Sequence, residues 1–199
     1  MYFLKILYNN SVCCKIENSY QQKFLEEKTK RNEKHREFLK QTKYSDLKVV
    51  EQVLKSIPNN CQLQISNSSM IRYVQLFDVN NTLQVFCNRG TSGIDGSTST
   101  AIGASLVNKK QTVFLTGDIS FFYDSNALWN NYVPKNFRII LVNNDGGGIF
   151  KIIPKMFNFE YHSAKNLEEV NQNLSDFYSI SDRPKILEIF TPSEKKEIK

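Results

Sequence analysis

Apolar and polar positions along the chain follow two alternating periods. After Ser45-Asp46, apolar residues recur at helical spacing as far as Ile57 and stop at Pro58, which predicts an amphipathic helix with an N-cap at Ser45. Short apolar runs bounded by polar or glycine-rich segments predict buried strands. We expect helices over 45–57, 67–77, 97–107, 121–131 and 167–178, and strands over 61–65, 83–87, 112–116, 137–142 and 185–190. Such alternation predicts an α/β domain, with a mostly parallel sheet that has helices on both faces.

The first 44 residues differ from the rest of the chain. Acids and bases alternate at helical spacing from Lys23 to Lys43, which predicts a charged, solvated helix over about 20–43. We therefore expect an N-terminal helical arm over 1–44, interpreted as a linker to a missing domain, and a folded domain over 45–199. Most of the net charge of +6 lies in the arm and the first domain helix.

Composition narrows the class of protein. A hydrophobic content of 40% in 199 residues is typical of a globular domain with its own core. The basic arm has no aromatic platform or binding motif beside its charges, so we do not expect nucleic-acid binding. No apolar run reaches the length of a membrane span, and we expect a cytoplasmic protein whose four cysteines are reduced thiols. Neither histidine, His35 nor His162, lies in a motif, and we assign neither a catalytic role.

Two short motifs indicate a divided metal site. Gly117-Asp118 follows one predicted strand, and Asn143-Asn144 followed by three glycines ends the next strand along the chain. One strand–helix–strand unit separates Asp118 from Asn144, so both lie at the same edge of a parallel sheet. Carboxylate, amide and exposed carbonyl oxygens are ligands that suit Mg²⁺. The alternative for Asp118 is an ordinary helix N-cap, which is common for an acid after a strand.

A third motif makes the pattern specific. The segments Asn88-Arg89-Gly90-Thr91-Ser92-Gly93-Ile94-Asp95-Gly96, Gly117-Asp118-Ile119-Ser120-Phe121 and 143–150 occur in this order and spacing. Together they resemble the SEPHCHC synthase family of menaquinone biosynthesis (the MenD family), whose members use thiamine diphosphate (ThDP). The resemblance extends from about Ser45 to Phe150, and more loosely to Pro192. It implies a ThDP-binding fold.

The resemblance also implies a reaction and its partners. Family members decarboxylate 2-oxoglutarate on ThDP and add the resulting succinyl-semialdehyde carbanion to isochorismate, which gives SEPHCHC and CO₂. Mg²⁺, with Mn²⁺ as the alternative ion, holds the cofactor diphosphate. ThDP enzymes of this type place the cofactor between subunits, so a homo-oligomer, or a missing N-terminal domain acting in trans, is implied.

Individual roles transfer only to matching positions. The resemblance makes Asp118, Asn144 and the carbonyl of Gly146 the metal ligands, and the cofactor-binding set is Ile94, Gly117, Asp118, Ile119, Ser120, Asn144 and Gly146. Ile94 would support the bent cofactor. Substrate contacts are implied for Ser68, Arg72, Arg89, Ile149 and Phe150. Guanidinium groups suit dicarboxylate substrates, although a surface arginine at position 72, a structural pair at 89 and core packing of the two apolar residues remain alternatives.

Three departures from the family limit these expectations. The family's catalytic glutamate, which protonates the cofactor's aminopyrimidine, has no match in this chain, so no catalytic residue is assigned. The stretch after Pro154 is shorter than in the family, and the chain ends soon after the last predicted strand. We therefore expect a cofactor-binding fragment that is inactive alone.

Two other functions remain open. One is another ThDP enzyme, such as an acetolactate synthase or a 2-oxoacid decarboxylase, although the segments 88–96 and 146–150 argue against it. The other is a non-catalytic module that binds cofactor or a partner subunit. A Rossmann-type nucleotide binder is disfavoured, because no Gly-x-Gly-x-x-Gly follows a strand.

Overall fold

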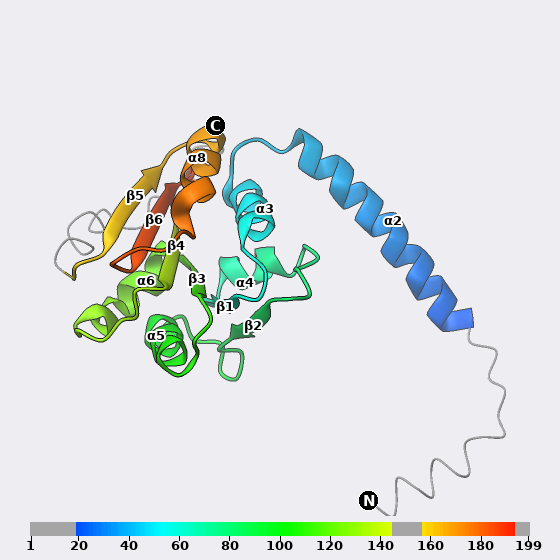
Figure 1. The fold of residues 1–199 in the computed structure, drawn as a ribbon. Helices are drawn as coiled ribbons and strands as arrows, with labels where there is room; N and C mark the ends of the chain where they lie inside the picture. The colour runs from blue at the N-terminus through cyan, green and yellow to red at the C-terminus, as the bar shows by residue number, and fades with distance from the viewer. Residues whose placement is uncertain (1–18, 145–156, 194–199) are drawn as a thin grey trace, which may run out of the picture. The chain divides into compact units, whose positions relative to one another are not determined.

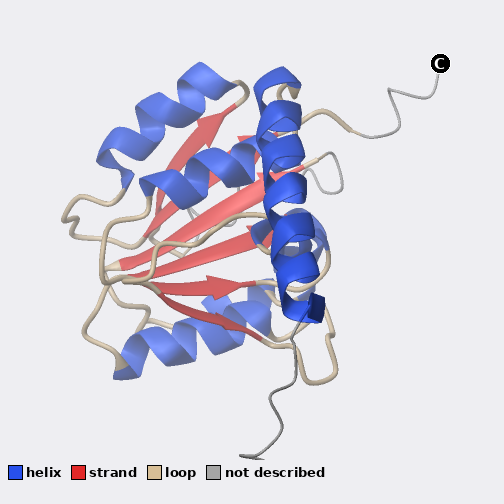
Figure 2. Ribbon diagram, turned by 90° about the vertical axis from the view of Figure 1, so that its right-hand side faces the viewer, coloured by secondary structure: helices blue, strands red, loops and turns tan. Residues whose placement is uncertain are grey.

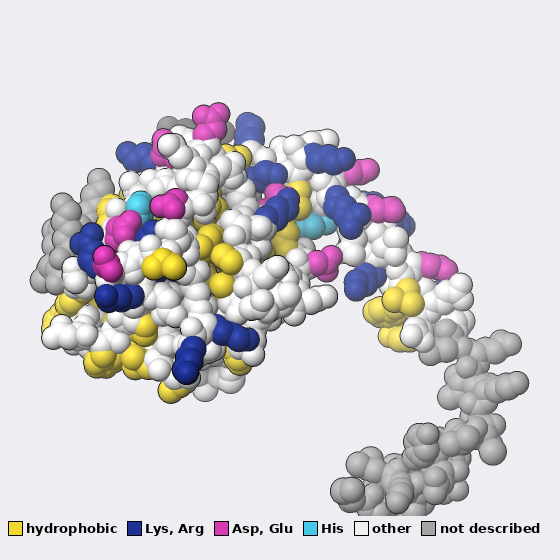
Figure 3. Space-filling model, viewed as in Figure 1, with side chains coloured by type: hydrophobic (Ala, Val, Ile, Leu, Met, Phe, Trp, Pro, Cys, Tyr) yellow, Lys and Arg dark blue, Asp and Glu magenta, His cyan; other side chains and the backbone are white. Residues whose placement is uncertain are grey.

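The computed structural model describes residues 19–144 and 157–193. Residues 1–42 and 43–199 form two compact units, each of which is described by itself. The first contains helix α2 (Ser19–Gln41), on which acidic and basic side chains are interspersed, as with Glu27 and Arg31 at 2.7 Å (Figure 3). No helix in the described segments combines the length and apolarity needed to cross a bilayer. The assignment of this arm as a linker to another domain stays a prediction.

The second unit is built around a six-stranded sheet in which every pairing is parallel (Figure 1). In sequence order the strands are β1 (Gln62–Ile65), β2 (Gln84–Cys87), β3 (Thr112–Gly117), β4 (Phe137–Asn143), β5 (Glu160–Ala164) and β6 (Lys185–Phe190). Their spatial order is β2-β1-β3-β4-β6-β5. The predicted α/β class with a mostly parallel sheet is confirmed.

Helices cover both faces of this sheet (Figure 2). On one face lie α3 (Asp46–Ser56), α4 (Ser69–Val74) and α8 (Leu167–Phe177); on the other lie α5 (Ser97–Val107), α6 (Asp118–Tyr123) and the 3₁₀ helix η1 (Ser125–Leu128). The central strands are apolar on both sides for this reason. Val113 and Leu115 of β3 enter the core under α3, α4 and α8, whereas Phe114 enters the core under α5 and α6.

The order of the strands determines where a ligand can bind. From β1 the chain moves to β2 on one side and then crosses to β3 on the other, so the direction of winding reverses between β1 and β3. The loops that leave the carboxyl ends of β1 and β3 therefore diverge to opposite faces of the sheet. In open parallel sheets, ligands bind in the crevice that this divergence creates.

Two elements differ from the sequence expectation. The edge strand β5 was not predicted, because its residues are polar and mostly half-buried and show no strict alternation. The helix expected over 121–131 is wrong in its bounds, since α6 ends at Tyr123 and a separate 3₁₀ turn follows. The cause is Asp124, whose buried carboxylate accepts hydrogen bonds from the backbone N–H (2.6 Å) and hydroxyl (2.7 Å) of Ser99 in the first turn of α5. Its backbone leaves the helical region to make them.

Candidate cofactor-binding site

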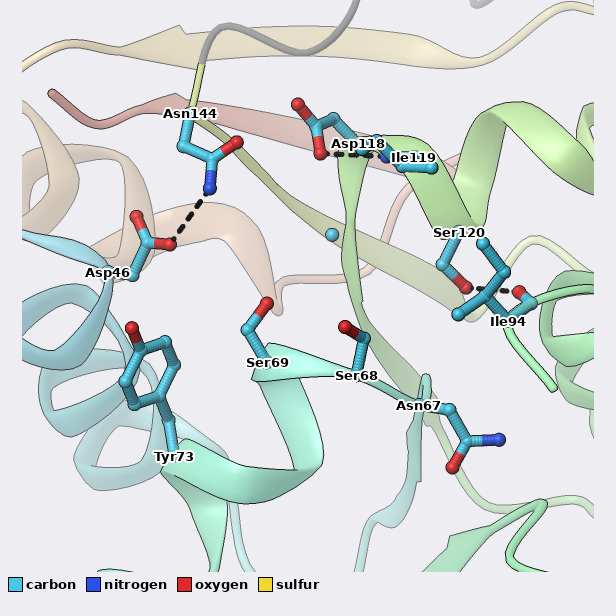
Figure 4. A pocket seen from close by; sticks show the side chains of 11 residues that line it. Asp46, Asn67, Ser68, Ser69, Tyr73, Ile94, Asp118, Ile119, Ser120 and Asn144 are labelled. Atoms are coloured by element: carbon cyan, nitrogen blue, oxygen red, sulfur yellow. Dashed lines mark hydrogen bonds between the residues drawn. The ribbon is translucent and has the colours of Figure 1, made fainter. Parts of the chain in front are cut away.

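A cavity of about 320 Å³ lies beyond the carboxyl ends of β1, β3 and β4, at the point where the winding reverses (Figure 4). It is lined by residues from the start of α3, the β1–α4 turn and α4, the loop before α5, the end of β3 and the start of α6, and the end of β4. These are Asp46, Asn67, Ser68, Ser69, Tyr73, Ile94, Gly117, Asp118, Ile119, Ser120 and Asn144. The structure thus brings most of the predicted cofactor residues to one cavity.

Asp118 lies at the cavity with only 5% of its surface exposed. It is not the N-cap of α6, because that position belongs to Gly117, and Asp118 is the first helical residue. One carboxylate oxygen, Oδ1, accepts a hydrogen bond from the N–H of Ile119 at 2.7 Å. Gly117 rather than Asp118 is therefore the N-cap, and the Asp118 carboxylate makes one local contact within the first turn.

The two asparagines at the end of β4 have different environments. Asn143 is buried and donates through Nδ2 to Oε1 of Glu188 at 2.7 Å, so its amide is fixed inside the sheet. Glu188 also accepts from the hydroxyl of Tyr161, and burial together with this carboxylate raises the pKa of that phenol. Asn144 is the asparagine that lines the cavity. Gly117 is opposite Val142 in the sheet, so Asp118 and Asn144 leave neighbouring strands at nearly the same level.

Figure 4 shows the Asp118 carboxylate and the amide oxygen of Asn144 directed toward the same part of the cavity. Neighbouring strands are about 4.8 Å apart, which is compatible with two ligands of one ion. Among the described residues, no three His, Cys, Asp or Glu side chains gather into a metal cluster. A site here would use one carboxylate, one amide and other oxygens, a donor set that suits Mg²⁺ better than softer ions.

Asn67 organises the loop between β2 and α5. Its amide nitrogen donates to the carbonyl oxygens of Asn88 and Gly93, both at 2.6 Å. Its amide oxygen accepts from Nη1 of Arg89 at 3.2 Å and from the thiol of Cys87 at 3.3 Å. Burial raises the pKa of the Cys87 thiol, partly opposed by Arg89, so this thiol remains a donor at neutral pH. Asn67 thus holds the loop, and the N-cap of α4 is the next residue, Ser68.

Ser120 holds the same loop at Ile94, the residue next to Gly93. Its hydroxyl donates to the carbonyl oxygen of Ile94 at 2.6 Å (Figure 4). Both residues line the cavity, as does the neighbouring Ile119, which is half exposed. Because α6 is only six residues long, its backbone provides little helix dipole for an anion, so anion binding here would depend on side chains, individual N–H groups and the metal.

The predicted substrate residues have separate positions. Ser68 lines the cavity, with a backbone φ of 73° that non-glycine residues rarely adopt. Arg72 on α4 and Arg89 are exposed and are not among the residues that line the cavity. Gly146, Ile149 and Phe150 lie outside the described residues.

Sequence reasoning did not assign Asp46, Asn67, Ser69 or Tyr73 to the site, yet all four line the cavity. Asp46 was interpreted only as part of a helix start. An acid in a first helical turn is so common that the sequence offers no signal for a second role.

Comparison with known proteins agrees with this geometry. Residues 65–183 match the family described as "Thiamine pyrophosphate enzyme, C-terminal TPP binding domain". The chain belongs to this family, whose cofactor, thiamine pyrophosphate, is ThDP, and therefore to the ThDP-dependent enzymes.

Individual relatives narrow the resemblance. The chain is 48% identical over 189 residues to the 2-succinyl-5-enolpyruvyl-6-hydroxy-3-cyclohexene-1-carboxylate synthase of Christiangramia forsetii, which covers 83% of this chain and 33% of that protein. It is 49% identical over 189 residues to the synthase of the same name from Flavobacterium johnsoniae (83% and 34%), and 45% over 207 residues to that of Flavobacterium psychrophilum (92% and 38%). The resemblance to the SEPHCHC synthase family is confirmed.

The lengths of these matches add two facts. The chain spans about a third of the length of these relatives. In the last comparison 207 aligned positions contain only 92% of the 199 residues, so the relative has residues within the matched region that this chain lacks. This agrees with a segment shorter than in the family.

Proposed function

We propose that this chain forms the diphosphate-binding part of a SEPHCHC synthase, which uses ThDP with Mg²⁺, or Mn²⁺, to decarboxylate 2-oxoglutarate and add the four-carbon product to isochorismate. The observation that supports this most strongly is the common cavity of Asp118 and Asn144, at the edge where β3 and β4 end. The names of the relatives supply the reaction.

When bound, ThDP supplies carbanion stabilisation, which is chemistry that protein side chains lack. The chain's own residues bind and orient. Asp118 and Asn144, with the carbonyl of Gly146 as a further expected ligand, would hold the cation that neutralises the diphosphate. Ile94 offers an apolar surface to the cofactor body, and its loop is held by Asn67 at Asn88 and Gly93 and by Ser120 at Ile94.

Substrate binding is proposed for a second group. Ser68 lines the cavity, and the exposed Arg72 and Arg89 are the cationic side chains expected to bind the carboxylates of 2-oxoglutarate and isochorismate. Ile149 and Phe150 would add an apolar wall. The glutamate that activates the cofactor would come from the part of the relatives that this chain does not match, as a separate domain or within a homo-oligomer.

Titration calorimetry with ThDP and Mg²⁺ tests the proposal. We expect binding by the wild-type chain, and a loss of at least about a hundredfold in affinity for Asp118→Ala, because one charged ligand is removed. Asp182→Ala is the matched control, since Asp182 is a fully exposed acid and does not line the cavity. Absence of cofactor binding by the wild type would leave only a structural or partner-binding module.

Turnover is a separate test. We expect no SEPHCHC from this chain alone with both substrates, and some product when the N-terminal two thirds of a relative is supplied in trans. Robust product from the isolated chain would contradict the view that it provides only part of the site. Formation of acetolactate from pyruvate would instead favour a different ThDP enzyme.

A further inference from the structure

Asp46 is an acidic residue of the cavity that no motif includes. It is the first residue of α3 and only 9% of its surface is exposed. Its Oδ2 accepts a hydrogen bond from Nδ2 of Asn144 at 3.3 Å, and its Oδ1 accepts one from the hydroxyl of Thr191. Thr191 is itself fixed to the end of β4, because its N–H donates to the carbonyl oxygen of Asn143 at 2.9 Å. The carboxylate is therefore held in place from the strand side.

This arrangement decides which end of the Asn144 amide faces the cavity. A side-chain amide has one donor end and one acceptor end, and a half-turn about its last bond exchanges them. An ionised carboxylate only accepts, so the NH₂ end of Asn144 must face Asp46. The carbonyl oxygen then faces away from Asp46, toward the side of the cavity where Asp118 lies (Figure 4).

Only the orientation with the Asn144 carbonyl oxygen toward the cavity allows the amide to coordinate a cation. The amide oxygen carries partial negative charge and can coordinate a metal, whereas the NH₂ group carries partial positive charge and repels one. Without a fixed acceptor behind it, Asn144 would occupy both orientations, and a bound ion would have to select the correct one. The negative charge of Asp46 also polarises the amide and makes its oxygen a better ligand.

We propose that Asp46 is a positioning residue that fixes the amide of Asn144 with its oxygen toward the metal, and so raises the affinity of the site for the divalent ion. The inference rests on the proposed function, because it assigns Asp46 to the same ion that Asp118 would bind. Asp46 does not itself need to touch the ion or the cofactor.

The first experiment measures metal binding directly. Mn²⁺ is added to the full chain at saturating ThDP, and the concentration of free Mn²⁺ is measured by electron paramagnetic resonance. We expect Asp46→Ala to weaken Mn²⁺ binding by about 10- to 100-fold, the usual range for residues that orient a metal ligand. Thr191→Val, which removes one bond to the carboxylate but keeps its charge, should weaken binding less and in the same direction.

A reciprocal exchange separates positioning from mere support of the fold. Asp46→Asn with Asn144→Asp keeps the net charge and reverses the hydrogen bond, so that the new amide at position 46 donates to a carboxylate at 144. That carboxylate still presents an oxygen to the cavity whichever way it turns. We expect Asn144→Asp alone to be impaired by repulsion from Asp46, and the double variant to recover most of the Mn²⁺ affinity.

The outcomes are distinguishable. If the wild type binds no Mn²⁺ with ThDP, the proposed function itself fails. If the wild type binds and Asp46→Ala binds equally well, or if the double variant is no better than the worse single variant, the positioning role is refuted. Thermal unfolding of each ligand-free variant verifies the fold. If Asp46→Ala does not fold, the comparison between the double variant and its two single variants still decides the question.

Discussion

Both ends of the sheet bury charged side chains, but they do so in different ways. At the amino end, Arg138 of β4 lies opposite Lys185 of β6, with 1% and 3% of their surfaces exposed. At the carboxyl end, Asp46 and Asp118 are almost as well buried. Judged by burial alone, the two ends would be equally good candidates for a functional site.

The hydrogen-bond partners of the buried charges distinguish the two ends of the sheet. Arg138 donates to the carbonyl oxygens of Phe177 (2.8 Å), Ser179 (2.5 Å), Lys135 (2.8 Å) and Phe137 (3.1 Å). Two of these acceptors lie at or just beyond the end of α8, where the helix dipole favours a cation. Burial lowers the pKa of Arg138, partly offset by the nearby Glu160. These bonds are all made within the protein, and Arg138 is not among the residues that line the cavity at the carboxyl end.

At the carboxyl end the acids line a cavity instead. Their bonds to Asn144, Thr191 and the N–H of Ile119 fix the side chains without covering the space in front of them. A buried charge thus indicates a binding site when its partners orient it toward a cavity. It indicates a structural role when the partners enclose it.

The largest effect on stability should come from a substitution at the amino end of the sheet, where Arg138 is enclosed by its partners. Arg138→Met removes the donor to four carbonyl oxygens, and we expect a loss of about 3–5 kcal/mol in the free energy of unfolding, because buried acceptors are left without partners. Chemical denaturation measures it. The exposed Arg183→Met is the control and should change stability by less than about 0.5 kcal/mol. Equal effects in the two variants would contradict an enclosed structural role for Arg138.

A substitution at the carboxyl end of the sheet should instead reduce ligand affinity and leave the stability nearly unchanged. For Asp118→Asn we expect the free energy of unfolding to change by less than about 1 kcal/mol, whereas Mg²⁺–ThDP affinity falls about a hundredfold, or about 2.7 kcal/mol. Denaturation without ligand and calorimetry with ligand give the two values. A large loss of stability with unchanged affinity would mean that Asp118 is structural, like Arg138.

Substitution of Asn67 tests whether one residue can contribute both to the stability of the fold and to cofactor affinity. Asn67→Ala removes two hydrogen bonds to carbonyl oxygens and two acceptor contacts, and we expect a loss of about 2 kcal/mol in stability. The loop that contains Ile94 would also lose its anchor, so ThDP affinity should fall about tenfold. As a control, Asn80→Ala alters an exposed asparagine bonded to Asn59 and Thr82, away from the cavity. Unchanged ThDP affinity in Asn67→Ala would show that the loop keeps its shape unaided.

The smallest expected effect is on stability at alkaline pH and depends on Tyr44. Burial raises the pKa of Tyr44 to about 12, with smaller contributions from Glu169 and Asp46, and its hydroxyl donates to the carbonyl oxygen of Phe190 at 2.8 Å. Because the folded pKa lies above the ordinary value of about 10, the stabilisation is complete below pH 10 and is lost as the pH rises through 12. Denaturation midpoints of wild type and Tyr44→Phe should therefore converge over this interval. A constant difference between them would refute this ionisation.

The sequence predicted the layers of the fold and the placement of Asp118 and Asn144 at one edge of the sheet, because both depend on local patterns. The run 137–142 includes apolar residues buried on both sides of the sheet, and Asp118 directly follows Gly117 at the end of β3. Strand β5 could not be predicted, since Glu160 and His162 show no apolar period. The break at Asp124 depends on Ser99, a partner 25 positions away, and no local pattern reports such a contact.

Residues of the site could likewise be predicted only where they belong to a local sequence motif. Asp118 and Asn144 belong to motifs, whereas Asp46 reaches the cavity only because α3 packs beside the ends of β4 and β6. Likewise, Asn67 has a cap-like sequence context but is turned toward the loop by carbonyl oxygens of residues more than twenty positions later. Tertiary contacts of this kind override local preference.

The cavity is assembled from five separate segments of the chain, distributed between residues 46 and 144. These segments are distant in sequence, so the cavity exists only when β1, β3 and β4 are paired in the sheet. A cofactor that binds there recognises the native state alone and adds to its stability by mass action, in proportion to the logarithm of its concentration. The amount of such a cofactor in a cell would then influence how much of this polypeptide stays folded.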